Sequence, residues 1–497
     1  MQDVIFNNSG YPLLSIMLFL PLAGAILVAL IDNTTRIKWT AMLVTLLNIL
    51  LCLPLLTGFD GSTHLIQFAE HRQWIASWNI NYFIGVDGIS VLFVALSALI
   101  SFFCVLVSWR AITEKIKLFY VTILLTETAM IGVFVALDLF LFYIFWEAVL
   151  IPMFMLIIVW GGANRSYAAV KFFLFTLAGS LLMLVGMVSI YLTGGGTFNI
   201  LELAQTDFAR NTQIWLFLAF FVAFAIKVPM FPFHTWLPHA HTEAPTAGSV
   251  ILAGVLIKMG AYGFLRFSLP MFPEAVMLFA RPLLIMSLIA IVYGALVTLM
   301  QKDIKRLIAY SSVSHMGFVT MGLFSLNLTG VQGGIYQMIS HGLVTGALFM
   351  AIGMIYERTH TREIADYGGL ARAVPLYTAF FTVFALAATG FPGTNSFIGE
   401  FLIISGALQA NPAIGALSVL GVVLGLAYIA WLYYRVFLFE VNETIKDRLS
   451  DLSIREVLIL VPFAAMIIYF GLKPAFLLDY MHASVTHLLA GITSAAP

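Results

Sequence analysis

Long apolar segments, separated by short polar ones, follow one another along almost the whole chain. A helix needs about 20 apolar residues to cross the hydrocarbon core of a bilayer, and about fourteen segments of this chain meet that length. Hydrophobic residues make up 61% of the 497 and charged residues only 10%, whereas roughly 25% are charged in a soluble domain. The sequence therefore predicts an all-α integral membrane protein. The predicted spans are 12–30, 39–57, 89–108, 118–137, 139–160, 172–193, 212–231, 247–269, 275–299, 307–327, 330–356, 376–408, 413–439 and 454–475.

The basic residues are unevenly shared between the predicted loops. Most lie in loops that follow odd-numbered spans, for example Arg36, Lys115 and Arg362. Loops rich in lysine and arginine stay on the cytoplasmic side of a membrane, or on the matrix side in an organelle. We therefore expect both termini on the opposite side. Basic and acidic residues are equal, at 24 each, so no net charge draws the chain to nucleic acid. The segment 58–88 is polar and rich in β-formers, which predicts a hairpin at the membrane surface.

Four ionisable residues lie inside predicted spans: Glu147, Lys227, Lys258 and Glu400. A charge at the centre of a membrane helix costs at least about 2.5–3.5 kcal/mol, which a purely structural role seldom justifies. The alternative is that the long side chains reach the headgroups. This alternative is stronger for Lys227, because Pro229 follows it closely. We interpret all four residues as functional.

The choice of lysine indicates proton handling. A lysine can release its proton in a membrane interior, whereas an arginine in practice cannot. Charge complementarity makes Glu147 the candidate partner of Lys227 or Lys258. Glu127, in the fourth span, is a further candidate for proton relay, and Asp138 is expected to be a loop residue.

Polar residues at helical spacing predict a hydrated track. Gln337, His341 and Thr345 recur every four residues and must share one helix face. Ser311 and His315 do the same on the preceding span. A membrane histidine can also serve only to hydrogen-bond neighbouring helices, but two in polar stripes on adjacent spans favour a relay. A haem pair is disfavoured, since each span supplies only one histidine.

Two spans contain helix-breaking residues close to a buried charge. Pro229 and Pro232 follow the lysine of the seventh span, and Gly390 and Pro392 precede the glutamate of the twelfth. Discontinuous helices in corresponding positions of two halves indicate a transporter site. An offset of five makes spans 4–8 and 9–13 inverted repeats. The predicted organisation is 1–117 (spans 1–3), 118–270 (first repeat), 271–440 (second repeat) and 441–497 (span 14 and tail).

The loop between spans 7 and 8 holds three histidines, His234, His239 and His241, together with Glu243. Prolines interrupt any common ligand face, and the spacing matches no zinc pattern. We therefore expect no metal site, and no cofactor in this chain. The hypothesis we prefer is that these residues collect protons at the surface and pass them towards Lys227.

Four runs resemble the antiporter-like subunits of respiratory complex I: DLFLFYIFWEAVLIPMF, KVPMFPFHTWLPHAHTEAPTAGSVILAGVLIKMGAYG, DIKRLIAYSSVSHMG and PGTNSFIGEF. The resemblance covers essentially the whole chain. It implies fourteen helices with two inverted five-helix repeats. It also implies proton translocation by Glu147, Lys227, Lys258 and Glu400. A glutamate at position 400, where the related L and N subunits usually have lysine, makes the chain most similar to subunit M, which is chain 4 in mitochondria.

The resemblance also implies partners. NADH, FMN, the iron–sulfur clusters and quinone reduction would belong to other subunits of the complex, and neighbouring antiporter-like subunits would flank this chain in the bilayer. The expected location is the bacterial cytoplasmic membrane, with the mitochondrial inner membrane as the alternative.

Our hypothesis for the mechanism is a path from the basic side. A proton loads Lys258 through the Lys227 region, passes His315 and His341 to Glu400, and leaves on the other face. Two alternatives stay open at this point. The chain can be a subunit of an Mrp-type cation/proton antiporter or membrane-bound hydrogenase, or a scaffold whose buried charges form internal salt bridges.

Overall fold

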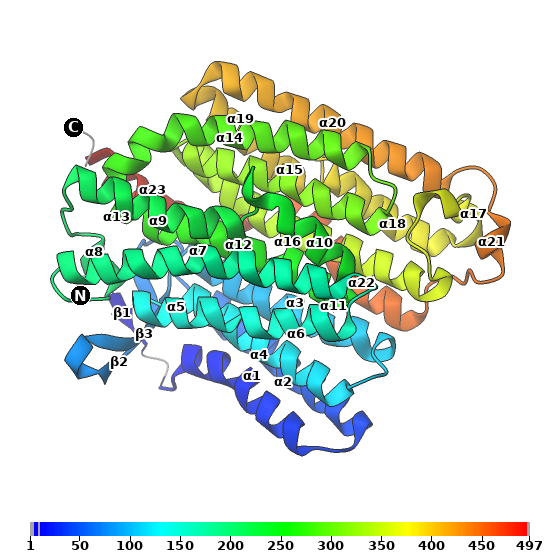
Figure 1. Ribbon diagram of the computed structural model, residues 1–497, viewed down its shortest axis with the longest axis horizontal. Helices are drawn as coiled ribbons and strands as arrows, with labels where there is room; N and C mark the ends of the chain where they lie inside the picture. The colour runs from blue at the N-terminus through cyan, green and yellow to red at the C-terminus, as the bar shows by residue number, and fades with distance from the viewer. Residues whose placement is uncertain (1–3, 8–9, 495–497) are drawn as a thin grey trace.

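Helices that run roughly side by side make up most of the computed structural model, which describes residues 4–7 and 10–494 (Figure 1). Within these residues, 12 helical segments are long and apolar enough to cross a membrane. All 12 coincide with predicted spans, which confirms the all-α membrane fold. They are Leu13–Leu30 (α1), Thr34–Thr57 (α2), Ser90–Ala111 (α3), Ile116–Val135 (α4), Leu139–Trp160 (α5 and α6), Arg165–Thr193 (α7), Thr246–Met271 (α11 to α13), Pro273–Leu299 (α14), Ile304–Phe324 (α15), Leu328–Thr359 (α16), Pro412–Phe437 (α20) and Ile454–Leu472 (α22).

The other two predicted spans are the two with helix-breaking residues. In the first, α9 (Arg210–Lys227) ends at the lysine, and the chain continues through the 3₁₀ turn η2 (Phe233–Trp236) into α10 (Leu237–Glu243). In the second, α18 (Pro375–Ala388) and α19 (Asn395–Ala410) are separated by a turn. Gly390 in that turn has φ +66°, a conformation that L side chains rarely adopt. Both predicted breaks are therefore present. The inverted repeats stay a prediction.

The span that carries Lys258 is also irregular, which the sequence analysis missed. The α-helical turns of α12 (Ile257–Gly263) lie between two π-helical segments, η3 (Leu252–Leu256) and η4 (Phe264–Ser268). Segments of this kind often mark functional positions in a helix. The fifth span is interrupted as well, because α5 (Leu139–Ala148) and α6 (Leu150–Trp160) meet at Val149, just after Glu147.

A small sheet lies at the end of the molecule that carries the termini (Figure 1). Strands β2 (Ile66–Ile75) and β3 (Ile80–Val86) pair antiparallel, and β1 (Val4–Phe6) joins β2 in parallel. The predicted hairpin is therefore confirmed. A further helix, α23 (Ala475–Ser494), was not predicted. It packs against α13, α14 and α16, and residues 495–497 of the predicted tail lie outside the described part.

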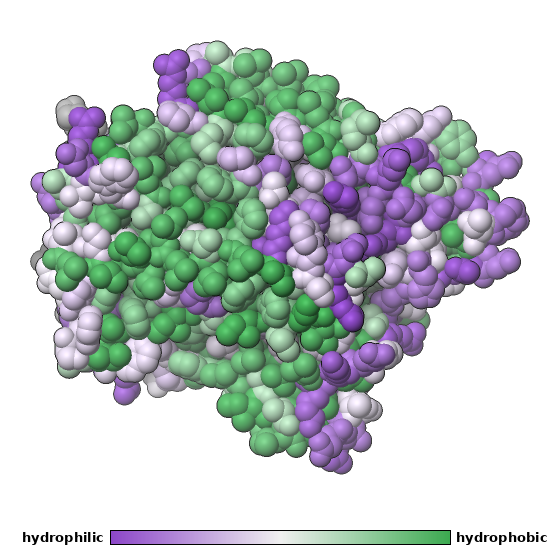
Figure 2. All heavy atoms as spheres, viewed as in Figure 1, coloured by the Kyte–Doolittle hydropathy of each residue, from purple (hydrophilic) through white to green (hydrophobic). Residues whose placement is uncertain are grey.

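Polar residues gather at the opposite end. Figure 2 shows an apolar band over the middle of the molecule and a strongly hydrophilic end, where Figure 1 places α17 (Leu370–Ala373) and α21 (Glu443–Lys446). We call this the basic end, because it carries Arg358, Arg362 and Lys446, and we call the other the terminal end. The separation agrees with the loop charges in the sequence.

Candidate functional site

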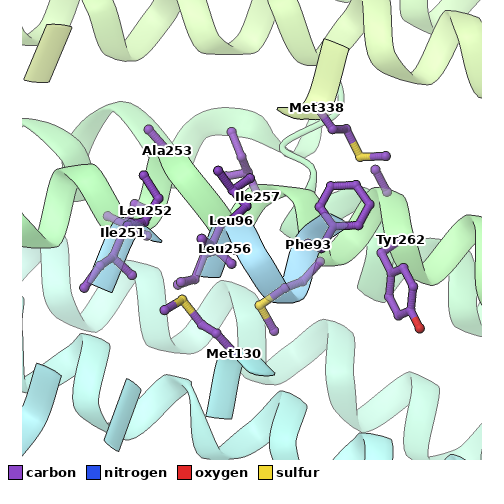
Figure 3. Close-up of a cluster of buried hydrophobic side chains, with 14 of the residues drawn as sticks. Phe93, Leu96, Met130, Ile251, Leu252, Ala253, Leu256, Ile257, Tyr262 and Met338 are labelled. Atoms are coloured by element: carbon purple, nitrogen blue, oxygen red, sulfur yellow. The ribbon is translucent and has the colours of Figure 1, made fainter. Parts of the chain in front are cut away.

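Lys258 is buried near the middle of the molecule, on α12. Its side chain is 0% exposed, and Nζ donates a hydrogen bond to the carbonyl of Ala253 and lies 2.7 Å from Nδ1 of His341 on α16. In the part of the chain that the structure describes, no carboxylate lies within ion-pair distance of this amine. Leu256 and Ile257 of the same span pack among apolar side chains beside it (Figure 3). The amine is therefore held by one carbonyl and one imidazole.

From His341, contacts between buried side chains continue through His315 to Glu400, in the broken twelfth span. The rings of His341 and His315 lie 5.7 Å apart between centroids, and Nδ1 of His315 lies 3.3 Å from Oε1 of Glu400, at ion-pair distance but not aligned as a hydrogen bond. The hydroxyl of Tyr428 lies 3.3 Å from the other ring nitrogen of His315. All these side chains are buried. We call Lys258, His341, His315 and Glu400 the buried row.

Glu400 lies at the break between α18 and α19. A Cβ atom on Gly390, in the turn, would lie 2.6 Å from Oε2 of Glu400, so any other residue there would displace the carboxylate. Nε2 of Gln337 donates to Oε1 of Glu400 at 3.3 Å. Because Gln337 and His341 are one turn apart on α16, a single helix face contacts both ends of the row. The polar stripe predicted for this helix therefore faces the site.

Lys227 is the last residue of α9, at the other break. It is only 1% exposed, and among the described residues Nζ has no hydrogen-bond partner, so its amine does not reach the headgroups. The ammonium lies 4.9 Å from the ring centroid of Trp146. Glu147 acts on it electrostatically without forming an ion pair within 4.0 Å.

The two lysines lie on closely packed segments but make no contact with each other among the described residues. A Cβ on Gly260, next to the buried row, would lie 2.7 Å from the carbonyl of Phe224 on α9. The absence of a side chain at Gly260 thus brings α9 and α12 together. The predicted step from Lys227 to Lys258 would cross this packed interface.

The predicted surface position is wrong for two of the three loop histidines, whereas His239 is partly exposed. His234 is 3% exposed and His241 is 0% exposed, because α10 packs against α7 and α15. The ring of His241 stacks on Phe349 at 4.8 Å, and neither of its nitrogens has a hydrogen-bond partner within the described part of the chain. Lys258 and Lys305 both act on it electrostatically. In the described part, no three His, Cys, Asp or Glu side chains are arranged to hold a metal ion.

Lys305 falls in the loop between the predicted spans 275–299 and 307–327, but the structure places it elsewhere. It lies in the first turn of α15, is 8% exposed, and donates to the carbonyl of Ala244 at the end of α10. His241 and Lys305 thus connect the basic end with the surroundings of Lys258. No local pattern distinguishes them from surface residues, because their burial depends on how α10 folds back.

Glu127 lies apart from the buried row. It is 0% exposed on α4 and accepts a hydrogen bond of 2.8 Å from Asn48 on α2. Its neighbours belong to the first four helices, whereas the row lies on α12, α15, α16 and α19. Asp138 is a loop residue as predicted, and it caps α5 by accepting from the backbone N–H groups of Phe140 and Leu141.

The fold and the site define a class: an integral membrane protein that holds contacting ionisable groups between its helices. Comparison with known proteins gives the family. The chain belongs to the NADH:quinone oxidoreductase/Mrp antiporter transmembrane family, whose model matches residues 136–425. That range includes every residue of the buried row, together with Glu147 and Lys227, and excludes Glu127.

Individual relatives match over nearly the whole chain. The NADH-quinone oxidoreductase subunit M of Rhodobacter capsulatus is 48% identical, covering 96% of each chain. The NADH-ubiquinone oxidoreductase chain 4 of Arabidopsis thaliana is 47% identical, covering 98% of each. A chain in the structure of respiratory complex I from Thermus thermophilus with bound NADH superposes with a TM-score of 0.89 at 33% identity, covering 96% of this chain and 99% of that one.

Proposed function

We propose that this chain is an antiporter-like membrane-arm subunit of a proton-pumping NADH:quinone oxidoreductase, and that the buried row carries its protons. The full-length similarity to subunit M and chain 4 supports the assignment to this complex over an Mrp-type antiporter or hydrogenase. The location is the bacterial cytoplasmic membrane. NADH oxidation, FMN, the iron–sulfur clusters and quinone reduction belong to partner subunits, and neighbouring antiporter-like subunits flank this chain.

The single observation that supports transfer is the contact between Lys258 and His341. An ammonium at 2.7 Å from Nδ1 can donate its proton when that nitrogen carries none. The imidazole then passes a proton from its other nitrogen towards His315, across a gap that a water molecule or a ring rotation closes. Glu400 accepts the proton from His315 as a carboxylate. Each step leaves the donor neutral and ready to be loaded again.

Protons reach Lys258 from the basic end in this proposal. His241 and Lys305 lie between that end and Lys258, and both are buried and titratable. Lys227 stands beside this route and has no hydrogen bond that fixes its charge. A change in the charge of Glu147 therefore alters the field at Lys227, and through it the loading of Lys258. Neighbouring subunits supply that change.

The proposal is tested on the native complex. A tag on this chain should co-purify NADH:quinone oxidoreductase activity, and NADH should drive proton uptake into liposomes that contain the purified complex. The uptake should be the same in sodium-free and sodium-containing buffer. Purification without the oxidoreductase activity, or proton flux that requires sodium, would instead indicate a secondary antiporter.

A further inference from the structure

A second row of polar contacts begins one turn after Lys258 and leads towards the terminal end. Tyr262 lies one turn after Lys258 on α12, so the two side chains share a helix face. The Tyr262 hydroxyl donates to the carbonyl of Phe134 at 3.1 Å and accepts from Nε of Arg266 at 3.0 Å. Arg266 also donates to Asp87 at 2.7 Å. The face that carries Lys258 therefore ends in a buried ion pair.

This ion pair borders a cavity of about 560 Å³. The cavity lies between the start of α3, the short helix α8 (Ile200–Leu203), α13 (Leu269–Met271) and α23, at the terminal end of Figure 1. Its polar lining includes Asp87, Gln213, Arg266, Glu274 and Ser484. Asp87 and Arg266 expose only 7% and 11% of their side chains, so they form the inner wall rather than the rim.

An aromatic cluster separates the cavity from Lys258. The ring of Tyr262 lies 5.1 Å from Phe134 and 6.4 Å from Phe93, and these two phenylalanines lie 5.2 Å from each other. Figure 3 shows Phe93 between Tyr262 and the residues Leu256 and Ile257 that adjoin Lys258. Water is excluded from such a cluster, so the passage is closed in this conformation.

The two charges of the inner wall are paired with each other. Arg266 cannot release its proton, so it holds Tyr262 and Asp87 in place but cannot itself carry a proton between them. Burial opposes the ionisation of Asp87, but the Arg266 guanidinium keeps the pKa of that carboxyl below its ordinary value. Tyr262 differs from both, because a hydroxyl can accept and donate a proton in one step.

We infer that this cavity is the aqueous outlet for protons released from Lys258, and that Tyr262, Arg266 and Asp87 form its gate. The inference rests on the proposed function. Lys258 then lies between an inlet and an outlet. The inlet passes His241, on the side of the π-helical segment η3, and the outlet passes Tyr262, on the side of η4. In this conformation the amine faces Ala253 and His341, and a rotation of η4 would turn it towards Tyr262. The proton that Glu400 accepts along the buried row returns through His315 and His341 to Lys258 before it is released into this cavity.

A thiol placed in the outlet tests its hydration and its role. Ala204 lines the cavity, whereas Ala209, five residues further on, is exposed and does not. Both native cysteines, Cys52 and Cys104, are buried. A bulky cationic methanethiosulfonate, added from the terminal side, should modify A204C and reduce NADH-driven turnover of the coupled complex roughly tenfold or more relative to the same untreated variant. The treated A209C variant and the treated wild type should keep their turnover.

Two results would overturn the outlet. One is that the reagent fails to modify A204C, which would mean that the cavity is closed to water. The other is that fully modified A204C keeps the turnover rate of the untreated variant. If Lys258→Met abolishes pumping in the same preparation while modified A204C pumps fully, the outlet fails and the proposed function stands. If Lys258→Met pumps normally, the proposed function itself fails.

The Tyr262 hydroxyl has its own test. Tyr262→Phe removes one oxygen and keeps the aromatic cluster, so turnover should fall and its solvent deuterium isotope effect should change. Tyr336→Phe is the matched control, because Tyr336 is also buried and its hydroxyl donates to a backbone carbonyl, that of Phe470 at 2.7 Å. Equal isotope effects in Tyr262→Phe and the wild type would assign the hydroxyl a packing role only and would contradict the gate.

Discussion

The two helix breaks hold their charges in opposite ways. At the break after α9, the ammonium of Lys227 has no hydrogen-bond partner and meets the face of Trp146. At the break between α18 and α19, the carboxylate of Glu400 has Gln337 and His315 within 3.3 Å. Both side chains are almost fully buried, so the difference lies in their partners and not in their access to solvent.

This difference indicates a separate role for each helix break. A charge with hydrogen-bonding neighbours can pass a proton to them, which is what a conducting row requires. A buried charge without such neighbours is poorly stabilised, so a small change in the local field shifts its proton equilibrium strongly. The Glu400 break therefore fits conduction, and the Lys227 break fits control of the row by Glu147.

The largest effect is expected at Lys258. Lys258→Arg keeps the positive charge but removes a proton that can be released, so we expect it to abolish NADH-driven pumping as completely as Lys258→Met. Proton uptake into proteoliposomes measures this. Lys117→Arg, at an exposed lysine, is the control and should pump normally. A pumping Lys258→Arg complex would show that only fixed charge matters there.

The second largest effect on pumping is expected from Lys227 and Glu147, at the break after α9. Lys227→Ala and Glu147→Ala should each abolish pumping and the turnover coupled to it, because the control of Lys258 is lost. Assembly should be largely intact, since Lys227 forms no hydrogen bond that holds the fold. Native gel electrophoresis and proton uptake give the two measurements. Normal pumping in either variant removes this pair from the mechanism.

A smaller effect on turnover is expected from Gln337, which donates a hydrogen bond to Glu400. A hydrogen bond to a charged group contributes about 1.5–3 kcal/mol, so Gln337→Leu should slow coupled turnover roughly tenfold or more. Gln332→Leu changes a partly exposed glutamine on the same helix, whose partner is His482, and should have no effect. If both variants behave alike, Gln337 does not position the carboxylate.

The sequence predicted the spans, the breaks and the hairpin, because apolar length and helix-breaking residues are local properties. It also predicted that one face of α16 would serve the site. It did not predict the two π-helical segments beside Lys258, since their hydrogen bonds depend on packing against α3, α9 and α16. The burial of His241 was missed for a similar reason: nothing within the loop shows that α10 folds against α15.

The cation–π contact should have a modest effect. An ammonium over a tryptophan gains about 0.5–2 kcal/mol, so Trp146→Leu should change coupled turnover only severalfold and should shift its pH dependence. The shift should be to lower pH, because removing the ring destabilises the ammonium form of Lys227. Turnover as low as that of Lys227→Ala would mean that Trp146 has a structural role instead.

The smallest effect is expected at the basic end. The hydrogen bond from Lys117 lowers the pKa of Asp32, so this carboxylate is ionised at neutral pH, but its side chain is 97% exposed. Asp32→Asn should therefore leave both turnover and thermal stability unchanged. A clear loss of turnover would place part of the inlet at this loop.

Infrared difference spectroscopy of the complex during NADH oxidation tests the buried row most directly. The carboxyl C=O stretching region should contain a band that shifts in deuterium oxide and is absent in Glu400→Gln, because Glu400 gains and loses a proton in each cycle. Spectra of the wild type and Glu400→Gln that coincide throughout this region would contradict proton transfer along the row.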